Sequence, residues 1–169
     1  MILRSDRLDL VPLELPVIEA LLAGDLERAR SLSGLPIGET TFAEDGHVLR
    51  LRRDQLRADP TELPWLLRAI VERATGEVVG RIGFHAAPVD GTVEIGYAVA
   101  PAHRRRGVAV EAATALIGMA RELGVRRCLG SFSPGNDASR AVLGRLGFTH
   151  VGEQVDEIDG PEEVHALAL

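Results

Sequence analysis

The sequence predicts a mixed α/β fold, in which about four helices flank a mostly antiparallel central sheet of roughly six to seven strands. Short apolar runs separated by glycine turns fill the middle of the chain, as in strands linked by hairpins. At residues 94–124 a strand leads through a basic glycine turn into a long helix. A further strand follows that helix, and a crossover of this length implies one parallel pair within the sheet.

Length and charge bound the class of protein. A chain of 169 residues is expected to form one domain, residues 1–169, with a core of its own. The net charge is −6 and the pI about 5.4, which argues against general binding of nucleic acid. No apolar run approaches the roughly 20 residues of a membrane span, and the N-terminus lacks the apolar core of a signal peptide. We therefore expect a cytoplasmic protein that binds no membrane.

Cysteine and lysine usage narrows the chemistry. Cys128 is the only cysteine, so no internal disulfide and no cysteine metal cluster is expected, and its strand position favours a small core residue. All 19 basic residues are arginines, which excludes covalent catalysis through lysine. The sequence implies no metal.

The N-terminal part alternates strand and helix. Leu8–Leu13 has the alternation of an opening strand. Leu15–Ala23 is predicted as a short helix with Pro16 in its first turn, where proline is tolerated. Residues 26–45 contain several breakers, and we expect a loop with a helix there. Gly46–Ala58 is predicted as the next helix, because apolar residues recur on one side of it.

Three strands follow as an antiparallel meander. Trp65–Glu72 and Glu77–His85 are predicted strands, joined by a glycine-containing hairpin turn at residues 73–76. The chain turns again at residues 88–91 into the strand Val93–Val99. The sequence Ala-Pro ends that strand, since proline cannot donate to a ladder.

The centre of the chain predicts an anion site. Apolar residues at helical spacing indicate a helix from Val108 to Leu123, ended by Gly124 in the left-handed conformation. The turn at residues 103–107 leaves the first N–H groups of this helix without partners, and the helix dipole adds partial positive charge there. Such a helix start binds phosphate or pyrophosphate. Gly107 and the small Ala109 let a ligand lie against the backbone.

The C-terminal part returns to the sheet. A strand is predicted to run parallel to Val93–Val99, and after it Asn136 or Asp137 caps a crossover helix. The chain is then expected to close as a hairpin that turns at residues 159–161. The predicted ranges are 126–132 for the strand, 136–146 for the helix, and 148–158 and 164–169 for the hairpin.

Two motifs at matching spacing resemble the GNAT superfamily of acetyltransferases. Arg104–Ala109, RRRGVA, fits the Arg/Gln-x-x-Gly-x-Gly/Ala pattern with which that family binds the pyrophosphate of acyl-coenzyme A. Asn136–Phe148, NDASRAVLGRLGF, resembles the later family segment. The opening LRSDRLDLVPL and the strand EIGYAV look most like the RimJ/RimL branch, which acetylates protein N-terminal amines and related small amines. The resemblance implies the GNAT fold, with a splayed parallel strand pair at the acyl-CoA site.

The same resemblance implies a set of cofactor-binding positions. Backbone N–H groups from Arg105 to Val110 would hold the pyrophosphate, and the Val99 N–H would face the thioester oxygen where the parallel strands separate. A solvated basic turn is the alternative for the arginine side chains. Asn136 would hold the pantetheine or cap its helix, and Arg140 would reach the phosphates or lie on a solvated face. The full set is Ala98, Val99, Ala100, Arg104, Arg105, Arg106, Gly107, Val108, Ala109, Val110, Asn136, Ser139 and Arg140.

The catalytic groups are less well defined by the resemblance. Many family members protonate the leaving thiolate with a tyrosine at the position of Leu143, and in the RimJ/RimL branch a serine, here Ser139, is proposed to replace it. A helix-surface serine is the alternative. Glu94, Tyr97 and His85 are candidates for the base, and we favour Glu94. Glu94 and Tyr97 should point to opposite faces of their strand. A further alternative is that water removes the amine proton.

The predicted function is transfer of an acyl group, from acetyl-CoA as co-substrate, to a primary amine by direct attack in a ternary complex. The acceptor would be a protein N-terminus, an amino acid or a small amine. The alternative is a binding module that keeps the acyl-CoA site as a sensor or scaffold without turnover. The protein is expected to be a monomer or a homodimer.

Overall fold

The computed structural model describes residues 1–156 and 160–169. Within them eight strands form one sheet in the spatial order β1-β2-β3-β4-β5-β6-β8-β7. The strands are β1 (Leu3–Arg4), β2 (Leu8–Pro12), β3 (Arg68–Glu72), β4 (Val78–Phe84), β5 (Thr92–Val99), β6 (Arg127–Phe132), β7 (Thr149–Asp156) and β8 (Gly160–Ala168). The helices are α1 (Leu15–Leu22), α2 (Leu26–Ser33), α3 (Gly46–Ala58), α4 (Val108–Glu122) and α5 (Asp137–Arg145), with short 3-10 turns η1 (Pro60–Glu62) and η2 (Pro101–His103).

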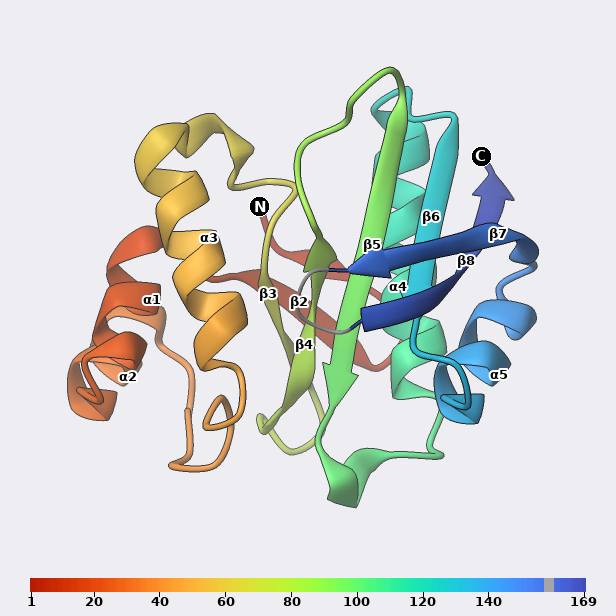
Figure 1. Ribbon diagram of the computed structural model, residues 1–169. Coiled ribbons are helices and arrows are strands. Elements are labelled where there is room, and N and C mark those ends of the chain that lie inside the picture. The colour runs from red at the N-terminus through yellow and green to blue at the C-terminus, as the bar shows by residue number, and fades with distance from the viewer. Residues whose placement is uncertain (157–159) are drawn as a thin grey trace.

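The sheet is antiparallel except at its centre. Strands β1 to β5 pair with their sequence neighbours as an antiparallel meander. α4 then carries the chain over to β6, which pairs with β5 in parallel, and β8 inserts between β6 and β7. Figure 1 shows β5 and β6 side by side, with α4 behind them and the β7–β8 hairpin turned across them. The mixed fold and its single parallel pair were predicted from the sequence.

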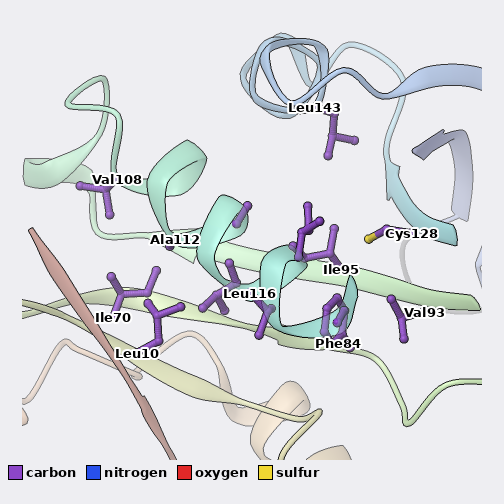
Figure 2. Close-up of a cluster of buried hydrophobic side chains, with 14 of the residues drawn as sticks. Leu10, Ile70, Phe84, Val93, Ile95, Val108, Ala112, Leu116, Cys128 and Leu143 are labelled. Carbon is purple, nitrogen blue, oxygen red and sulfur yellow. The ribbon is translucent and has the colours of Figure 1, made fainter. Parts of the chain in front are cut away.

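Each face of the sheet carries its own apolar cluster. Successive residues of a strand point to opposite faces, and β3 divides its side chains accordingly. Ile70 belongs to the cluster beneath α4, whereas Ala69 and Val71 belong to the cluster beneath α1 and α3. Figure 2 shows the first cluster, in which Leu116 of α4 lies among strand side chains. We call these two sides of the sheet the α4 face and the α3 face.

α4 lies close to the sheet because several of its inward residues are small. Ala112, Ala113 and Ala120 are fully buried together with Leu116. Burial of a leucine side chain of this kind stabilises the fold by roughly 1.5–3 kcal/mol. The helix ends two residues before Gly124, whose φ of 84° is the left-handed conformation that its position predicted.

The parallel pair stays together over a short stretch only. β5 and β6 pair from Thr92 with Arg127 to Glu94 with Leu129. Beyond Glu94, β5 continues against β4 as far as Val99, and β6 continues against β8 as far as Phe132. The two strands therefore leave a gap between their facing edges, which confirms the predicted splay.

The structure differs most from the sequence prediction at β1, at the start of β3 and at the start of β8. The two-residue strand β1 was not predicted, because so short a run gives no periodicity. β3 begins at Arg68 rather than Trp65, since Leu66 and Leu67 enter the core before regular pairing starts. β8 begins at Gly160 rather than Val164 and tolerates Pro161, because pairing with β6 ends at Glu163.

Further predictions concern the last hairpin, residues 26–45 and membrane spans. The predicted strand end at Ile158 and the turn residue Asp159 lie outside the described residues. α2 occupies the part of residues 26–45 where a helix within a loop was expected. In the described part of the chain, no helix combines the length and apolar character needed to cross a membrane.

Candidate functional site

The start of α4 carries a row of free backbone donors. Among residues 1–156 and 160–169, no acceptor pairs with any amide N–H from Arg105 to Val110, and no side chain caps the helix. Gly107, with φ of 79°, and Arg105, with φ of 60°, both adopt the left-handed conformation that forms this turn. Unpaired donors together with the helix dipole make a site for an anionic group such as a pyrophosphate.

The three arginines of the turn have different environments. Arg104 donates through Nε to the carbonyl oxygen of Val99 at 2.9 Å and so ties the turn to the end of β5. Arg106 lies 3.4 Å from a carboxylate oxygen of Glu72. Arg105 makes no hydrogen bond or ion pair within the described part of the chain and is exposed. Arg105 is therefore the side chain of the three that is most available to an anion.

The Val99 amide points into the gap between β5 and β6. In an antiparallel pair, alternate residues turn their backbone groups toward the partner strand. His85 N–H donates to Glu94 O at 2.8 Å and Ala100 N–H donates to Val79 O at 2.9 Å, so the even-numbered residues of β5 face β4. Val99 has the other parity, and its N–H faces away from β4 beyond the last residue that pairs with β6. This donor is placed to receive developing negative charge on a carbonyl oxygen.

On the α4 face, a serine and a tyrosine meet beside this gap. Asn136 caps α5, accepting a hydrogen bond from the Ser139 amide at 3.1 Å, as predicted for this residue. Ser139 lies in the first turn of α5, close enough to Tyr97 of β5 to influence its ionisation. Burial raises the pKa of Tyr97, the neighbouring Ser139 lowers it, and the net direction is upward. The Tyr97 hydroxyl is buried and lacks a hydrogen-bond partner in the part of the chain that the structure describes.

Leu143 fills the space next to this pair. It is buried, and a Cβ added at Gly130 of β6 would lie 2.9 Å from one of its methyl carbons. Figure 2 shows Leu143 pointing from α5 toward Ile95 and Cys128. The apolar side chain at this position offers no proton donor, whereas Tyr97 and Ser139 beside it carry hydroxyl groups.

Arg140 and Cys128 are occupied by the protein itself. Arg140 contacts Glu163 at 2.6 Å and Asp137 at 3.0 Å, and its guanidinium lies over the ring of Phe132. Its predicted contact with the coenzyme stays a prediction. Cys128 is fully buried, and burial raises the pKa of its thiol to about 12, in keeping with a core residue.

Glu94 lies on the opposite face, as its separation from Tyr97 predicted. Its carboxylate accepts a hydrogen bond from the hydroxyl of Ser131 at 2.7 Å. Gln154 of β7 donates to the same Ser131 oxygen at 3.1 Å and to Glu162 of β8 at 2.9 Å. These bonds join β5, β6 and the C-terminal hairpin on the α3 face, and they hold the Glu94 carboxylate in one orientation.

His85 adjoins Glu94 at the end of β4. Its Nδ1 lies 3.7 Å from a carboxylate oxygen of Glu94, and its carbonyl oxygen accepts bonds from Arg52 at 2.6 Å and Gln55 at 2.8 Å, both on α3. The ring lies over Gly96, where an added Cβ would come within 2.7 Å of Nε2. Glycine at 96 is therefore what lets the imidazole occupy this place.

Several charges determine the ionisation of His85. Burial lowers the pKa of the half-exposed imidazole, Glu94 raises it and Arg52 lowers it, and the more distant Glu162 and Asp156 raise it. The net direction is downward from 6.5. The imidazole is consequently neutral near pH 7 and able to accept a proton. A cavity of about 50 Å³ between α3 and the sheet opens beside it.

The geometry of the site defines the class of ligand that it can hold. A helix start with free amides lies beside a gap in the sheet, with hydroxyl groups on one side of the gap and carboxylate and imidazole groups on the other. Such a site suits an elongated donor that carries phosphate at one end and a reactive carbonyl at the other. Residues 7–149 match the acetyltransferase (GNAT) domain family, and the chain belongs to that family. The predicted enzyme class, an N-acetyltransferase, is confirmed at the level of the family.

Individual relatives agree with this assignment. The chain is 31% identical over 150 residues to the uncharacterized N-acetyltransferase YjdG of Bacillus subtilis, covering 87% of this chain and 89% of that protein. The ribosomal-protein-S5-alanine acetyltransferase of Vibrio fischeri is 13% identical, with a TM-score of 0.67 over 99% of this chain and 96% of the other. The microcin C7 self-immunity acetyltransferase MccE, solved with acetyl-CoA and AMP, is 18% identical, with a TM-score of 0.68 over 98% and 94%. The two solved structures establish a shared fold.

Sequence reasoning missed several groups of this site. Ser131 and Gln154, which fix Glu94, lie far from it in sequence and carry no motif. Arg52 and Gln55 lie in the predicted helix at residues 46–58, but no sequence pattern singled them out. The meeting of Tyr97 with Ser139 depends on how α5 packs on β5, which periodicity does not determine.

Proposed function

We propose that the protein transfers the acetyl group of acetyl-CoA to a primary amine by direct attack in a ternary complex. The observation that carries this proposal is the row of unpaired amides from Arg105 to Val110 beside the gap between β5 and β6. A pyrophosphate on these donors would direct the pantetheine arm along the gap toward Val99. The set of cofactor-binding residues predicted from the sequence is retained in this proposal.

The donor is activated on the α4 face and at the strand edge. The Val99 N–H donates to the thioester oxygen and stabilises the charge that grows there as the carbonyl carbon becomes tetrahedral. When the C–S bond breaks, the electron pair remains on the sulfur. Ser139 passes its hydroxyl proton to the departing thiolate and regains one from water.

The acceptor is activated from the α3 face. Glu94, held by Ser131 and adjoining His85, removes the proton from the amine, directly or through a water molecule. The carboxylates of Glu94 and Glu162 also favour the approach of a positively charged amine. The base must act before or during attack, because a protonated amine has no lone pair.

The acceptor class follows from the branch that the motifs resemble. A RimJ/RimL-like enzyme would acetylate a protein N-terminus, an amino acid or a small amine. The ribosomal-protein-S5-alanine acetyltransferase, which shares the fold, supports a protein acceptor among these. Cytoplasmic location, independence from metal, and a monomeric or homodimeric state remain parts of the proposal.

A second candidate function is an acyl-CoA sensor that binds without turnover. Leu143, an apolar residue where many family members place the acid, is the observation that favours it. The sensor would bind acetyl-CoA through the same amides and would leave the thioester intact.

Release of free thiol separates the two functions. Acetyl-CoA is incubated with the protein and a panel of amines, comprising alanine- and serine-initiated peptides, free amino acids and a diamine, across a range of pH. We expect at least one amine to stimulate release and to gain one acetyl group by mass spectrometry. Tight binding of acetyl-CoA by calorimetry with no stimulated release at any pH would leave the sensor as the function. EDTA should not change the rate.

A further inference from the structure

We propose that Tyr97 is a positioning residue for the acyl-CoA reaction, whose buried hydroxyl becomes hydrogen-bonded through Ser139 only when the thioester end of the donor occupies the gap. This inference rests on the proposed function and gives Tyr97 a role other than that of the base, for which the sequence made it a candidate. It starts from one feature, a fully buried hydroxyl oxygen that lacks a partner among residues 1–156 and 160–169.

The placement of Tyr97 is specific to the donor side of the site. Tyr97 and Val99 share the α4 face of β5, in the stretch that has already separated from β6. The side chain of Ser139 on α5 lies near enough to the phenol to lower its pKa through a hydrogen-bonding interaction, but the two hydroxyls do not reach ordinary hydrogen-bond geometry. Leu143, one turn further along α5, closes the apolar side. The phenol therefore lies where the sulfur end of the donor is expected.

A buried hydroxyl without a hydrogen-bond partner makes folding of the ligand-free protein less favourable. Removal of a polar group from water without a replacement hydrogen bond opposes folding, and such groups are rare unless a ligand or a reaction uses them. With the donor bound, the Ser139 hydroxyl would bridge the phenol and the sulfur. The Tyr97 hydroxyl, which lacks a partner in the free protein, would therefore gain a hydrogen bond in the complex.

Tyr97 keeps its proton throughout the reaction, and every bond that forms is matched by one that breaks. The amine nitrogen bonds to the carbonyl carbon, the C–S bond breaks, and the electron pair goes to sulfur. The Ser139 hydroxyl proton moves to sulfur, while the Tyr97 O–H donates a hydrogen bond to the Ser139 oxygen and stabilises its negative charge. Water returns a proton to Ser139, and the amine proton leaves on the opposite face.

Burial of the phenol also favours its role as a hydrogen-bond donor. It raises the pKa of Tyr97, so the phenol keeps its proton and remains a donor throughout turnover. A phenol in this state is unsuited to be the base for the amine, which agrees with the assignment of that task to the α3 face. Charged groups that affect the phenol do not include Glu94, which lies on the other side of the sheet.

The first experiment detects a change in the environment of the Tyr97 hydroxyl and does not require enzymatic activity. Tyr97 is the single tyrosine of the chain, so protein labelled with ¹³C at the tyrosine ζ carbon gives one NMR signal. We expect acetyl-CoA and CoA to shift this signal in the wild type, and Ser139→Ala to abolish most of the shift. Saturation with acetyl-CoA, shown by calorimetry, with no movement of the signal would overturn the inference while leaving coenzyme binding intact.

The second experiment separates positioning from a structural role. Tyr97→Phe removes only the hydroxyl, and since that group has no partner in the free protein, the melting temperature should stay the same or rise. With an amine found active on the panel, its kcat should fall about tenfold, the usual scale for one hydrogen bond to a charged group, at unchanged KM for acetyl-CoA. A fall in melting temperature together with unchanged kcat would overturn the inference and mark the hydroxyl as structural.

A double-mutant cycle tests the route through Ser139. If Tyr97 acts through Ser139, the double variant Tyr97→Phe/Ser139→Ala should match Ser139→Ala alone within about twofold. Multiplied losses would instead show that the phenol acts on its own. Ser133→Ala, an exposed serine in the loop before α5, is the matched control and should behave as wild type. A wild type that binds acetyl-CoA but acetylates no amine would overturn the proposed function, and the mechanistic inference with it.

Discussion

Arg7 and Glu111 form a close ion pair, with 2.7 Å between Arg7 Nη2 and Glu111 Oε2. The Arg7 amide and Ser5 hydroxyl also donate to Glu111, at 2.7 and 2.6 Å, and Arg7 Nη2 donates to the carbonyl oxygen of Arg106 at 3.1 Å. These contacts fasten the N-terminal segment to the first turn of α4. They also neutralise a carboxylate that would otherwise oppose an anion at the helix start. The adjacent hollow of about 360 Å³, between Arg4 and Thr114, lies apart from the free amides.

Arg7→Met should weaken acetyl-CoA binding by roughly threefold to tenfold, because the charge of Glu111 is then uncompensated near the pyrophosphate. The stability loss should be about 1 kcal/mol or less, since Arg7 is half exposed. Calorimetry and thermal denaturation measure the two effects. Arg4→Met, in the same segment and more exposed, is the control. Equal affinities for the two variants would count against the screening role.

The pKa of Glu111 gives this contact a pH dependence. Burial raises the pKa, the hydrogen bonds from Ser5 and Arg7 lower it, and the net direction is below 4.5. The folded state therefore prefers the charged carboxylate, so the stability it contributes is present above about pH 4.5 and is lost as the pH falls through the folded pKa. Acid unfolding of Arg7→Met should show a smaller loss over this window than the wild type.

Gly107→Glu should reduce acetyl-CoA affinity about a hundredfold or more, because its carboxylate repels the pyrophosphate and its backbone no longer fits the turn. Gly107 has φ of 79°, so part of the effect is strain of roughly 1–2 kcal/mol on the fold. Gly124→Glu controls for that strain, since Gly124 has φ of 84° at the other end of α4. Both variants should lose similar stability. Similar affinity losses would contradict the placement of the pyrophosphate.

Gly96→Ala should displace the His85 imidazole at little expense in stability, because the contact of 2.7 Å falls on a side chain that can move. Gly83→Ala places its Cβ 2.5 Å from the Leu66 carbonyl oxygen, and the resulting backbone shift should cost roughly 1–3 kcal/mol. Thermal denaturation compares the two, and turnover of Gly96→Ala should fall. Full activity in a Gly96→Ala protein whose imidazole has moved would exclude His85 from the acceptor site.

Glu94→Gln should lower kcat about a hundredfold with little change in the KM for acetyl-CoA, since the base acts on the acceptor side. It should also lower the pKa of His85 further, because Glu94 is a charge that raises it. Histidine NMR and steady-state kinetics provide the measurements. Glu153→Gln, an exposed carboxylate on β7, is the matched control. Unchanged turnover would leave solvent water as the proton acceptor.

The sequence predicted most of the fold because its signals are local. Glycine turns and periodicity placed the meander, and the strand–turn–helix at the centre determined the parallel pair. β1 was not predicted because two residues are too few to show an alternating pattern. The site divides in the same manner: the amides from Arg105 to Val110 follow from helix geometry alone, whereas the Ser131 bond to Glu94 depends on which residues adjacent strands bring into register.

Backbone amide NMR during a titration with CoA tests the central claim most directly. The amide signals from Arg105 to Val110 should show the largest shifts, followed by Val99, and Gly107→Glu should suppress them at the same CoA concentration. Saturable binding that leaves those amides unmoved, with the largest shifts elsewhere in the chain, would contradict the account.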